Sequence, residues 1–354
     1  MNKIIKIITI VATSLISTSV ALAQTLAHPA NCAELELITP DAKAAGMADI
    51  GASTSPDVFS QHWNVAKYAF VKDTMAVGLS YTMWMPMVDF TNLFYLAGYY
   101  KMGKQTLSAS IRYKVGGSSA KLQQNQDFVY NELSPNQFSI DFGYSRSFGN
   151  YFSVGLATRF ISLPKAEAIG NNLYAPTRTG ALAFDLGLYF AYPLRDKKDE
   201  IAVGLSIKNV GTKVAVNDDL KEFLPQTMYL GSRYSISLES KDVLTLAVEV
   251  TKPLVPRRQE NKGVIEGLFS SFGNNIYDWS ISLGGEYFYQ QKIAARVGYH
   301  FGDTDYKNGA GSYLSVGGGL KLWQNMMFDL SYMITTSGVS TMSNNVRASL
   351  QYTF

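Results

Sequence analysis

Apolar residues recur at every second position in a series of roughly ten-residue segments along residues 75–354. Residues 75–81 and 107–113 are clear examples. Successive side chains of a β-strand point to opposite faces, so this period predicts strands with one apolar and one polar face. We expect fourteen strands, at residues 75–84, 92–100, 106–115, 137–148, 151–163, 180–193, 200–210, 226–238, 242–251, 279–289, 293–301, 313–323, 326–335 and 345–354.

The connections between these segments alternate in length. Tight connections are expected at residues 101–105, 149–150, 194–199, 239–241, 290–292 and 324–325. Long ones are expected at 116–136, 164–179, 211–225 and 252–278, and intermediate ones at 85–91, 302–312 and 336–344. Short turns at one end and long loops at the other are typical of bacterial outer-membrane barrels. An even number of strands then places both termini on the short-turn, periplasmic side, with the long loops outside the cell.

Nearly all charged residues inside the strands fall on the polar face, and the exceptions, Arg146 and Asp242, lie beside turns. In one strand Leu107 and Ile111 share the apolar face, and Arg112 lies on the other. A charge facing lipid at mid-membrane costs about 2–4 kcal/mol, so this pattern is the one that a bilayer imposes. The charges that we expect in the lumen are Arg112, Asp141, Arg159, Asp185, Arg233, Glu249, Glu286, Arg296 and Arg347.

The alternative is a soluble barrel with its apolar face inward. Fourteen strands enclose too wide a lumen for side chains alone to fill. The composition also favours a membrane barrel: 47% of residues are apolar and 13% aromatic, and only 17% are charged, below the usual quarter. The sequence therefore predicts an all-β fold, a 14-stranded antiparallel transmembrane β-barrel at residues 75–354. The net charge of +3 is too small to indicate nucleic acid as a partner.

Residues 1–23 have the features of a secretory signal peptide. Lys3 and Lys6 precede a largely apolar stretch that ends in Ala21-Leu22-Ala23, a small-x-small cleavage site. The alternative, a membrane-anchoring helix, needs a longer apolar run. Cys32 is the one cysteine, so it is either a free thiol or a partner in a disulfide between chains.

Residues 24–74 precede the predicted barrel and lack a strand period. Small residues, Gly and Pro are frequent, and residues 41–47 predict a short helix that begins near Asp41. A segment this distinct, next to a wide and charged lumen, is expected to fold into the lumen as a plug; the alternative is a flexible periplasmic tail. The residues that mark the predicted plug are Pro40, Asp41, Gly46, Trp63 and Asn64.

These residues also carry a family resemblance. The stretches Thr-Pro-Asp-Ala-Lys-Ala-Ala-Gly-Met at 39–47, Thr-Ser-Pro-Asp at 54–57 and His-Trp-Asn-Val-Ala-Lys at 62–67 resemble the FadL-like outer-membrane barrels. They resemble more closely the PorV (LptO) family of the type IX secretion system. The last motif in that family usually reads Trp-Asn-Pro-Ala, and Val65 replaces the proline here.

The resemblance implies a 14-stranded barrel with an N-terminal plug in the bacterial outer membrane, surrounded by outer-membrane lipid. It also implies that the protein binds C-terminal signal domains of secreted cargo. In that family, cargo is carried from a SprA-like translocon barrel to a PorU-like attachment complex.

Residues for catalysis, a cofactor or a metal are not indicated. The three histidines, His28, His62 and His300, are not spaced as metal ligands, and no nucleophile-elbow motif is present. The glycine run at 317–319 lies inside a predicted strand, where it indicates a bend or a close approach. We therefore expect a protein that is not an enzyme.

The 252–278 loop is the predicted partner-binding site. Exposed apolar side chains at high density usually mark a binding surface. The residues that we expect to bind are Arg257, Arg258, Ile265, Leu268, Phe269 and Phe272; alternatively, the loop folds inward and caps the lumen.

Two other functions remain open. A FadL-type transporter of long-chain fatty acids or other hydrophobic molecules would need an apolar pocket inside the barrel. The predicted inner face is mostly Ser, Gly, Thr and charged residues, so we expect no such pocket. A porin or structural barrel is the third possibility, and the predicted plug argues against an open pore.

Overall fold

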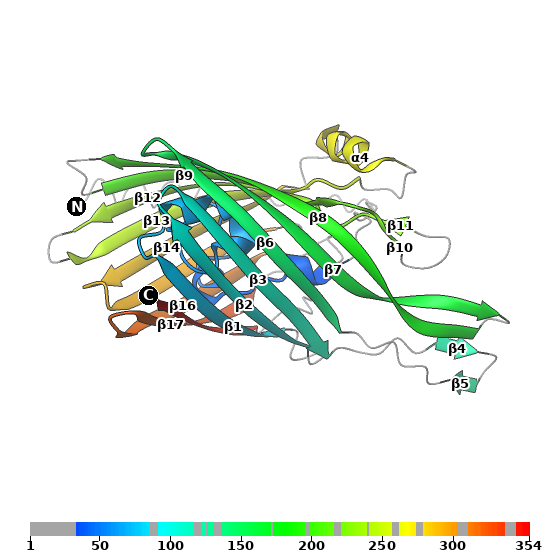
Figure 1. The fold of residues 1–354 in the computed structure, drawn as a ribbon. Coiled ribbons are helices and arrows are strands. Elements are labelled where there is room, and N and C mark those ends of the chain that lie inside the picture. The colour runs from blue at the N-terminus through cyan, green and yellow to red at the C-terminus, as the bar shows by residue number, and fades with distance from the viewer. Residues whose placement is uncertain are drawn as a thin grey trace.

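The computed structural model of the protein describes residues 33–84, 91–116, 122–124, 127–129, 136–170, 173–194, 199–215, 221–238, 241–256, 262–273, 279–302, 311–336 and 345–354. Fourteen strands form one closed barrel in which every neighbouring pair is antiparallel, and β18 pairs with β1 to close it (Figure 1). The strands are β1 Met75–Trp84, β2 Thr91–Met102, β3 Gln105–Gly116, β6 Gln137–Phe148, β7 Phe152–Gly170, β8 Leu173–Leu194, β9 Asp199–Gly211, β12 Thr227–Ser237, β13 Val243–Pro253, β14 Ser280–Tyr289, β15 Ile293–Phe301, β16 Tyr313–Trp323, β17 Met326–Thr335 and β18 Val346–Thr353.

The two faces of the barrel wall differ in the way that the period predicts. On β3, Ser108 and Ser110 are buried inside, whereas Leu107 and Ile111 are exposed on the outer wall. Large apolar side chains cover the outer wall on the other strands too, as with Phe142, which is 62% exposed. An outer wall of this kind is stable in lipid. The 14-stranded antiparallel transmembrane barrel is therefore confirmed.

The largest departure from the predicted strands is at β7 and β8. Residues 164–179 were expected to form a loop, but β7 and β8 continue through this region as a long hairpin beyond the other strands (Figure 1). Pro164 pairs with Arg178, and Pro176 with Ala166. The apolar period ends here because the hairpin has left the apolar band, so the expectation of a loop was wrong.

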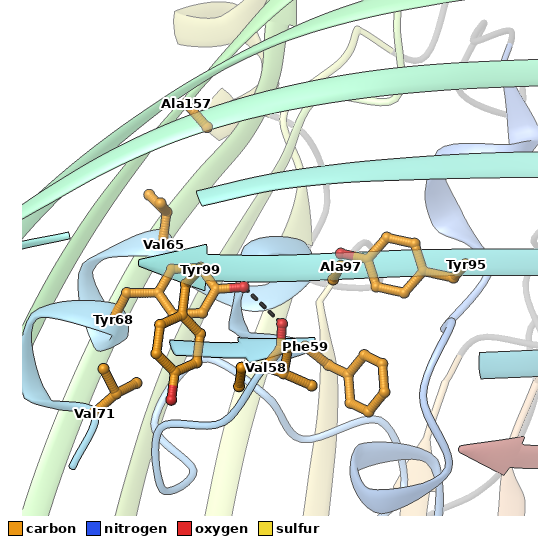
Figure 2. Close-up of a cluster of buried hydrophobic side chains, with 10 residues drawn as sticks. Val58, Phe59, Val65, Tyr68, Val71, Tyr95, Ala97, Tyr99 and Ala157 are labelled. Atoms are coloured by element: carbon orange, nitrogen blue, oxygen red, sulfur yellow. Dashed lines mark hydrogen bonds between the residues drawn. The ribbon is translucent and has the colours of Figure 1, made fainter. Parts of the chain in front are cut away.

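The N-terminal segment, residues 33–71, lies inside the barrel; we call it the plug. It contains the short elements η1 Glu34–Leu37, α2 Ala42–Ala45, α3 Ser60–Trp63 and η2 Val65–Phe70. Figure 2 shows Val58, Phe59 and Tyr68 of the plug packed against Tyr95 and Tyr99 of β2. Among the described residues, no helix is long and apolar enough to cross a membrane.

The remaining elements belong neither to the barrel wall nor to the plug, and they lie at the long-loop end. They are the two-stranded sheets β4 Leu122–Gln124 with β5 Asp127–Val129 and β10 Val214–Ala215 with β11 Lys221–Glu222, and the helices α4 Val264–Ser270 and η4 Ser271–Gly273. At the opposite, short-turn end, the backbone N–H of Phe354 donates to the carbonyl of Met75 at 2.8 Å. The start of β1 and the end of β18 thus meet at the short-turn end.

Candidate functional site

The plug is held together by Asp41. Its carboxylate caps α2 by accepting from the N–H of Ala44 at 2.9 Å, and it accepts from the indole N–H of Trp63 at 2.6 Å. Both residues are buried. Burial raises the pKa of Asp41 to about 6; nearby Asp57 adds to the rise, and the two hydrogen bonds oppose it. One side chain therefore joins α2 and α3, the second and third helical elements of the plug.

The other residues that mark the plug contact the barrel wall. The Asn64 amide donates to the carbonyls of Ala52, at 3.1 Å, and of Leu188 on β8, at 2.9 Å. The carbonyl of Pro40 accepts from the hydroxyl of Ser80 on β1. The structure thus brings together, inside the lumen, the residues that mark the plug in the sequence.

Glycines of the inner wall allow the plug to lie directly against the strands. A Cβ atom on Gly204 would lie 1.9 Å from the carbonyl oxygen of Ala52. A Cβ atom on Gly317 would lie 2.9 Å from the Cα atom of Gly46. Within the glycine run on β16, Gly317 is therefore a site of close approach between wall and plug, one of the two interpretations that the sequence allowed.

Glu36 links the plug to cations of the wall. Its carboxylate lies 3.4 Å from Arg112 and 3.3 Å from Arg159, and all three side chains are buried. Arg159 also pairs with Asp141 at 2.6 Å and with Asp185 at 3.0 Å. Three carboxylates thus surround Arg159. The arginine is therefore part of a network of ion pairs that includes Glu36 of the plug, and it is not a lone buried charge.

His62 lies beside this network. Arg112 donates to Nδ1 of His62, and the Lys208 ammonium lies 3.4 Å from the same atom. Burial holds the pKa of His62 well below its usual range, and the neighbouring cations Lys208, Arg112 and Arg159 lower it further. His62 is therefore a neutral acceptor for the arginine.

The remaining predicted lumen charges all lie on the inner wall. Three of them bind the plug backbone: Arg233 donates to the carbonyl of Ser53, Arg347 donates to that of Thr39, and Glu249 accepts from the N–H groups of Gly51 and Ala52. Arg296 pairs within the wall with Glu286 at 2.6 Å and with Asp329 at 2.7 Å. Most of these charged residues of the inner wall thus bind the plug or form ion pairs with one another.

At the long-loop end, α4 presents an apolar face to the surroundings. Ile265 and Phe269 are 60% and 70% exposed, and Phe272 of η4 is half exposed. These residues stand four and three positions apart, so they share one side of the helical segment. We call the three residues Ile265, Phe269 and Phe272 the α4 stripe. In the described segment 262–273, these three side chains are therefore exposed rather than packed into the barrel.

The opposite side of α4 rests on the rim of the barrel. A Cβ atom on Gly267 would lie 2.8 Å from the ring of Phe223, so helix and ring are in close contact. The ammonium of Lys252 on β13 lies 5.1 Å from the ring centre of Trp279 and 5.7 Å from that of Phe272, both within cation–π range. The contacts of Phe223 with Gly267 and of Lys252 with Phe272 thus position the α4 stripe.

The predicted binding residues divide into three groups. Ile265, Phe269 and Phe272 are on the exposed stripe, whereas Leu268 is half buried. Arg257 and Arg258 lie outside the described residues. Phe223, Gly267 and Lys252 were not predicted, because their contacts join loops that are distant in sequence. Within the described part of the chain, no group of three or more His, Cys, Asp or Glu residues could hold a metal ion.

Comparison with known proteins identifies the family. The family model described as "Type IX secretion system protein PorV" matches residues 26–260, which include the plug and the strands through β13. The chain belongs to the PorV family. It is thus an outer-membrane β-barrel of the type IX secretion system. No curated protein matches the PorV-family chain.

Solved structures agree on the fold. The PorV-family chain resembles the Ralstonia pickettii toluene transporter TbuX, at 12% identity and a TM-score of 0.51, with 89% of this chain and 98% of that one covered. It also resembles the Pseudomonas putida toluene transporter TodX, at 11% identity and a TM-score of 0.54, with 87% and 96% covered. At such identities, the likeness supports the barrel fold and nothing about the ligand.

Proposed function

We propose that this PorV-family protein binds the C-terminal signal domains of secreted cargo at its extracellular rim. It then carries them from a SprA-like translocon barrel to a PorU-like attachment complex, without catalysing a reaction. The observation that carries the proposal is the exposed α4 stripe. Apolar side chains this exposed at the rim of a barrel favour a protein partner.

The proposal includes an orientation in the membrane. The signal peptide at residues 1–23 directs export, the short turns and both termini face the periplasm, and the long loops face outward. Barrels of bacterial outer membranes have this arrangement of short and long connections. The α4 stripe then faces the surroundings of the cell, where exported cargo arrives.

The plug occupies the lumen, which supports binding at the rim of the barrel rather than conduction through its centre. Wall glycines such as Gly204 contact the plug backbone, and Arg112, Arg159 and Glu36 join the plug to the wall by buried ion pairs. Removing one partner of such a pair costs about 3–5 kcal/mol, because the other charge is left buried and unpaired. A cargo path through the centre would have to break these contacts.

The direct test is binding of a purified cargo C-terminal domain to the full-length protein in detergent. Truncating two central apolar anchors typically costs at least 2 kcal/mol, so I265S/F269S should weaken the affinity about thirtyfold or more. The matched control is Glu266→Ser, on the same helix and also exposed, which should leave the affinity within about twofold. Equal affinities for wild type and I265S/F269S would refute the α4 stripe as the binding site.

The second candidate is transport of fatty acids or other hydrophobic molecules, which the FadL-like fold favours. The described inner wall offers little for such a ligand, because Ser, Thr and charged residues dominate it. The test is uptake of a radiolabelled long-chain fatty acid by cells with and without the protein. Uptake that depends on the protein, together with unchanged cargo attachment, would support this candidate over the first.

A further inference from the structure

Lys252 lies on the outer face of the barrel wall. On β13, Leu246 and Val248 are exposed on that face, and Lys252 stands an even number of positions further along the strand. Its partner across the β12–β13 pair is Met228, which has the same parity as the exposed Leu230. Directly opposite residues of an antiparallel pair point to the same face of the sheet. The side chain of Lys252 is therefore directed away from the lumen.

Although it points outward, Lys252 is only 1% exposed, because two aromatic side chains lie over it. Its ammonium lies 5.7 Å from the ring centre of Phe272 on η4 and 5.1 Å from that of Trp279, directly before β14. The segment formed by α4 and η4 thus packs against the outside of the wall. Figure 1 shows α4 outside the outline of the barrel wall, at its long-loop end.

The α4 stripe is continuous with the lipid-facing surface of the wall. Phe272 of the stripe and Trp279 lie beside the same ammonium group. Trp279 in turn has the parity of Ile281 on β14, and both are exposed on the outer wall. Exposed apolar side chains therefore lead from the stripe to the part of the wall that lipid covers.

The height of this contact follows from the end of the apolar band. The outward-facing residues of β13 are apolar as far as Val250, and Lys252 is the next outward position toward the long-loop end. A lysine that faces lipid is costly at mid-membrane and nearly without cost at the interface. An exposed Trp such as Trp279 is also typical of the membrane interface. Phe272 and the helix before it therefore lie at the level of the lipid headgroups.

The sides of α4 differ in polarity. Ile265 and Phe269 are exposed on one side, whereas Gly267 is buried against the ring of Phe223. Glu266 is also exposed, and it stands one position from Ile265, so it points to a different side of the helix. A helix with one apolar and one polar side lies along a membrane surface with its apolar side among the lipids.

We propose that α4 is an interfacial helix, and that the α4 stripe is inserted among the lipids of the leaflet at the long-loop end. Lipid is the inferred occupant because the stripe continues the lipid-facing wall at headgroup level. The proposal does not depend on whether cargo binds the stripe. If cargo binds there, it meets the stripe at the membrane surface and displaces lipid from it.

The test is spin-label accessibility of the full-length protein in vesicles of phosphatidylethanolamine and phosphatidylglycerol. Cys32 is the one cysteine, so C32S provides a background for single labels at I265C and F269C. Oxygen concentrates in lipid and a nickel chelate stays in water, so the ratio of their collision rates with the label reports its surroundings. We expect this ratio at I265C and F269C to approach that of F142C on the outer wall.

The matched control is E266C, on the same helix and also exposed. Its ratio should approach that of K221C, an exposed position of β11 at the long-loop end. Ratios at I265C and F269C equal to that of K221C would place the stripe in water and overturn the proposal. Equal ratios at F269C and E266C would also overturn it, because the two sides of α4 would not differ. The heat-induced mobility shift of the folded barrel on a gel verifies that every variant folds.

The outcome for the proposed function is separate. Cargo binding to I265S/F269S is measured in detergent, where no bilayer covers the stripe. A stripe in lipid with unchanged cargo affinity in I265S/F269S would sustain the interfacial helix and refute the cargo site. A stripe in water with weakened cargo affinity would do the reverse.

Discussion

The indole N–H of Trp63 donates to the carboxylate of Asp41 at 2.6 Å, inside a barrel whose wall encloses both residues. The bond joins two parts of the plug that are 22 residues apart in sequence. Because Asp41 also caps α2, the plug depends on this one carboxylate at two points.

Trp63→Phe should destabilise the protein. The substitution leaves Oδ1 of Asp41 buried without its donor, and an unsatisfied buried group costs about 1–3 kcal/mol, more when it is charged. Urea unfolding of the barrel in lipid vesicles should report a loss of this size. Trp279→Phe is the control, because Trp279 is exposed at the rim and should lose less. Equal losses in both variants would contradict the role of the Trp63 hydrogen bond.

The stability of the plug should fall as the pH rises from about 4 to about 6. Burial raises the pKa of Asp41 from 3.8 to about 6, so the folded state binds its proton more tightly than the unfolded state does. The stabilisation is complete below pH 3.8 and is lost as the pH rises through about 6. Protease accessibility of the plug, measured across this range, should increase with pH. Asp41→Asn should remove this component, and an unchanged pH profile in that variant would contradict it.

Gly204→Ala should displace the plug. The added Cβ would lie 1.9 Å from the Ala52 carbonyl oxygen, which is backbone, so the plug chain has to shift. Overpacking of this kind typically costs about 1–3 kcal/mol. The matched control is Gly318→Ala on β16, where the nearest atom to the new Cβ is 3.8 Å away. Urea midpoints that fall equally in both variants would show that the contact with the plug is unimportant.

Arg159→Met should be among the most destabilising single changes. It leaves Glu36, Asp141 and Asp185 without their shared cation, and breaking a buried ion pair from one side costs about 3–5 kcal/mol. The free energy of unfolding in vesicles measures the loss. Lys241→Met, in an exposed turn, should stay within about 0.5 kcal/mol of wild type. A loss below 1 kcal/mol for Arg159→Met would mean that these carboxylates are not held by the arginine.

The barrel could be predicted because the bilayer imposes a period on every strand. Residues 107–113 alternate in the sequence, and the same residues alternate between outer wall and lumen in β3. Beyond the apolar band, that constraint ends. The continuation of β7 and β8 as a hairpin therefore left no periodic signal, and it contains prolines at 164 and 176, which are disfavoured inside sheets.

The candidate sites could be predicted only in part. The sequence indicated that the residues of the α4 stripe are apolar and exposed. Which side of α4 faces outward depends on contacts with Phe223 and Lys252, which lie in other segments of the chain. In the lumen, the parity of the charges predicted which residues face inward. Their partners, such as Ala52 against Gly204, depend on the path of the plug through the barrel, which no local pattern records.

The most direct test of the central claim uses a strain that lacks this protein and is complemented with either wild type or I265S/F269S. Surface attachment of secreted cargo is measured by antibody labelling of intact cells, with barrel levels matched. Our account predicts that wild type restores attachment, whereas I265S/F269S does not. Full attachment with I265S/F269S would contradict it, as would a deletion strain that loses only fatty-acid uptake and still attaches its cargo.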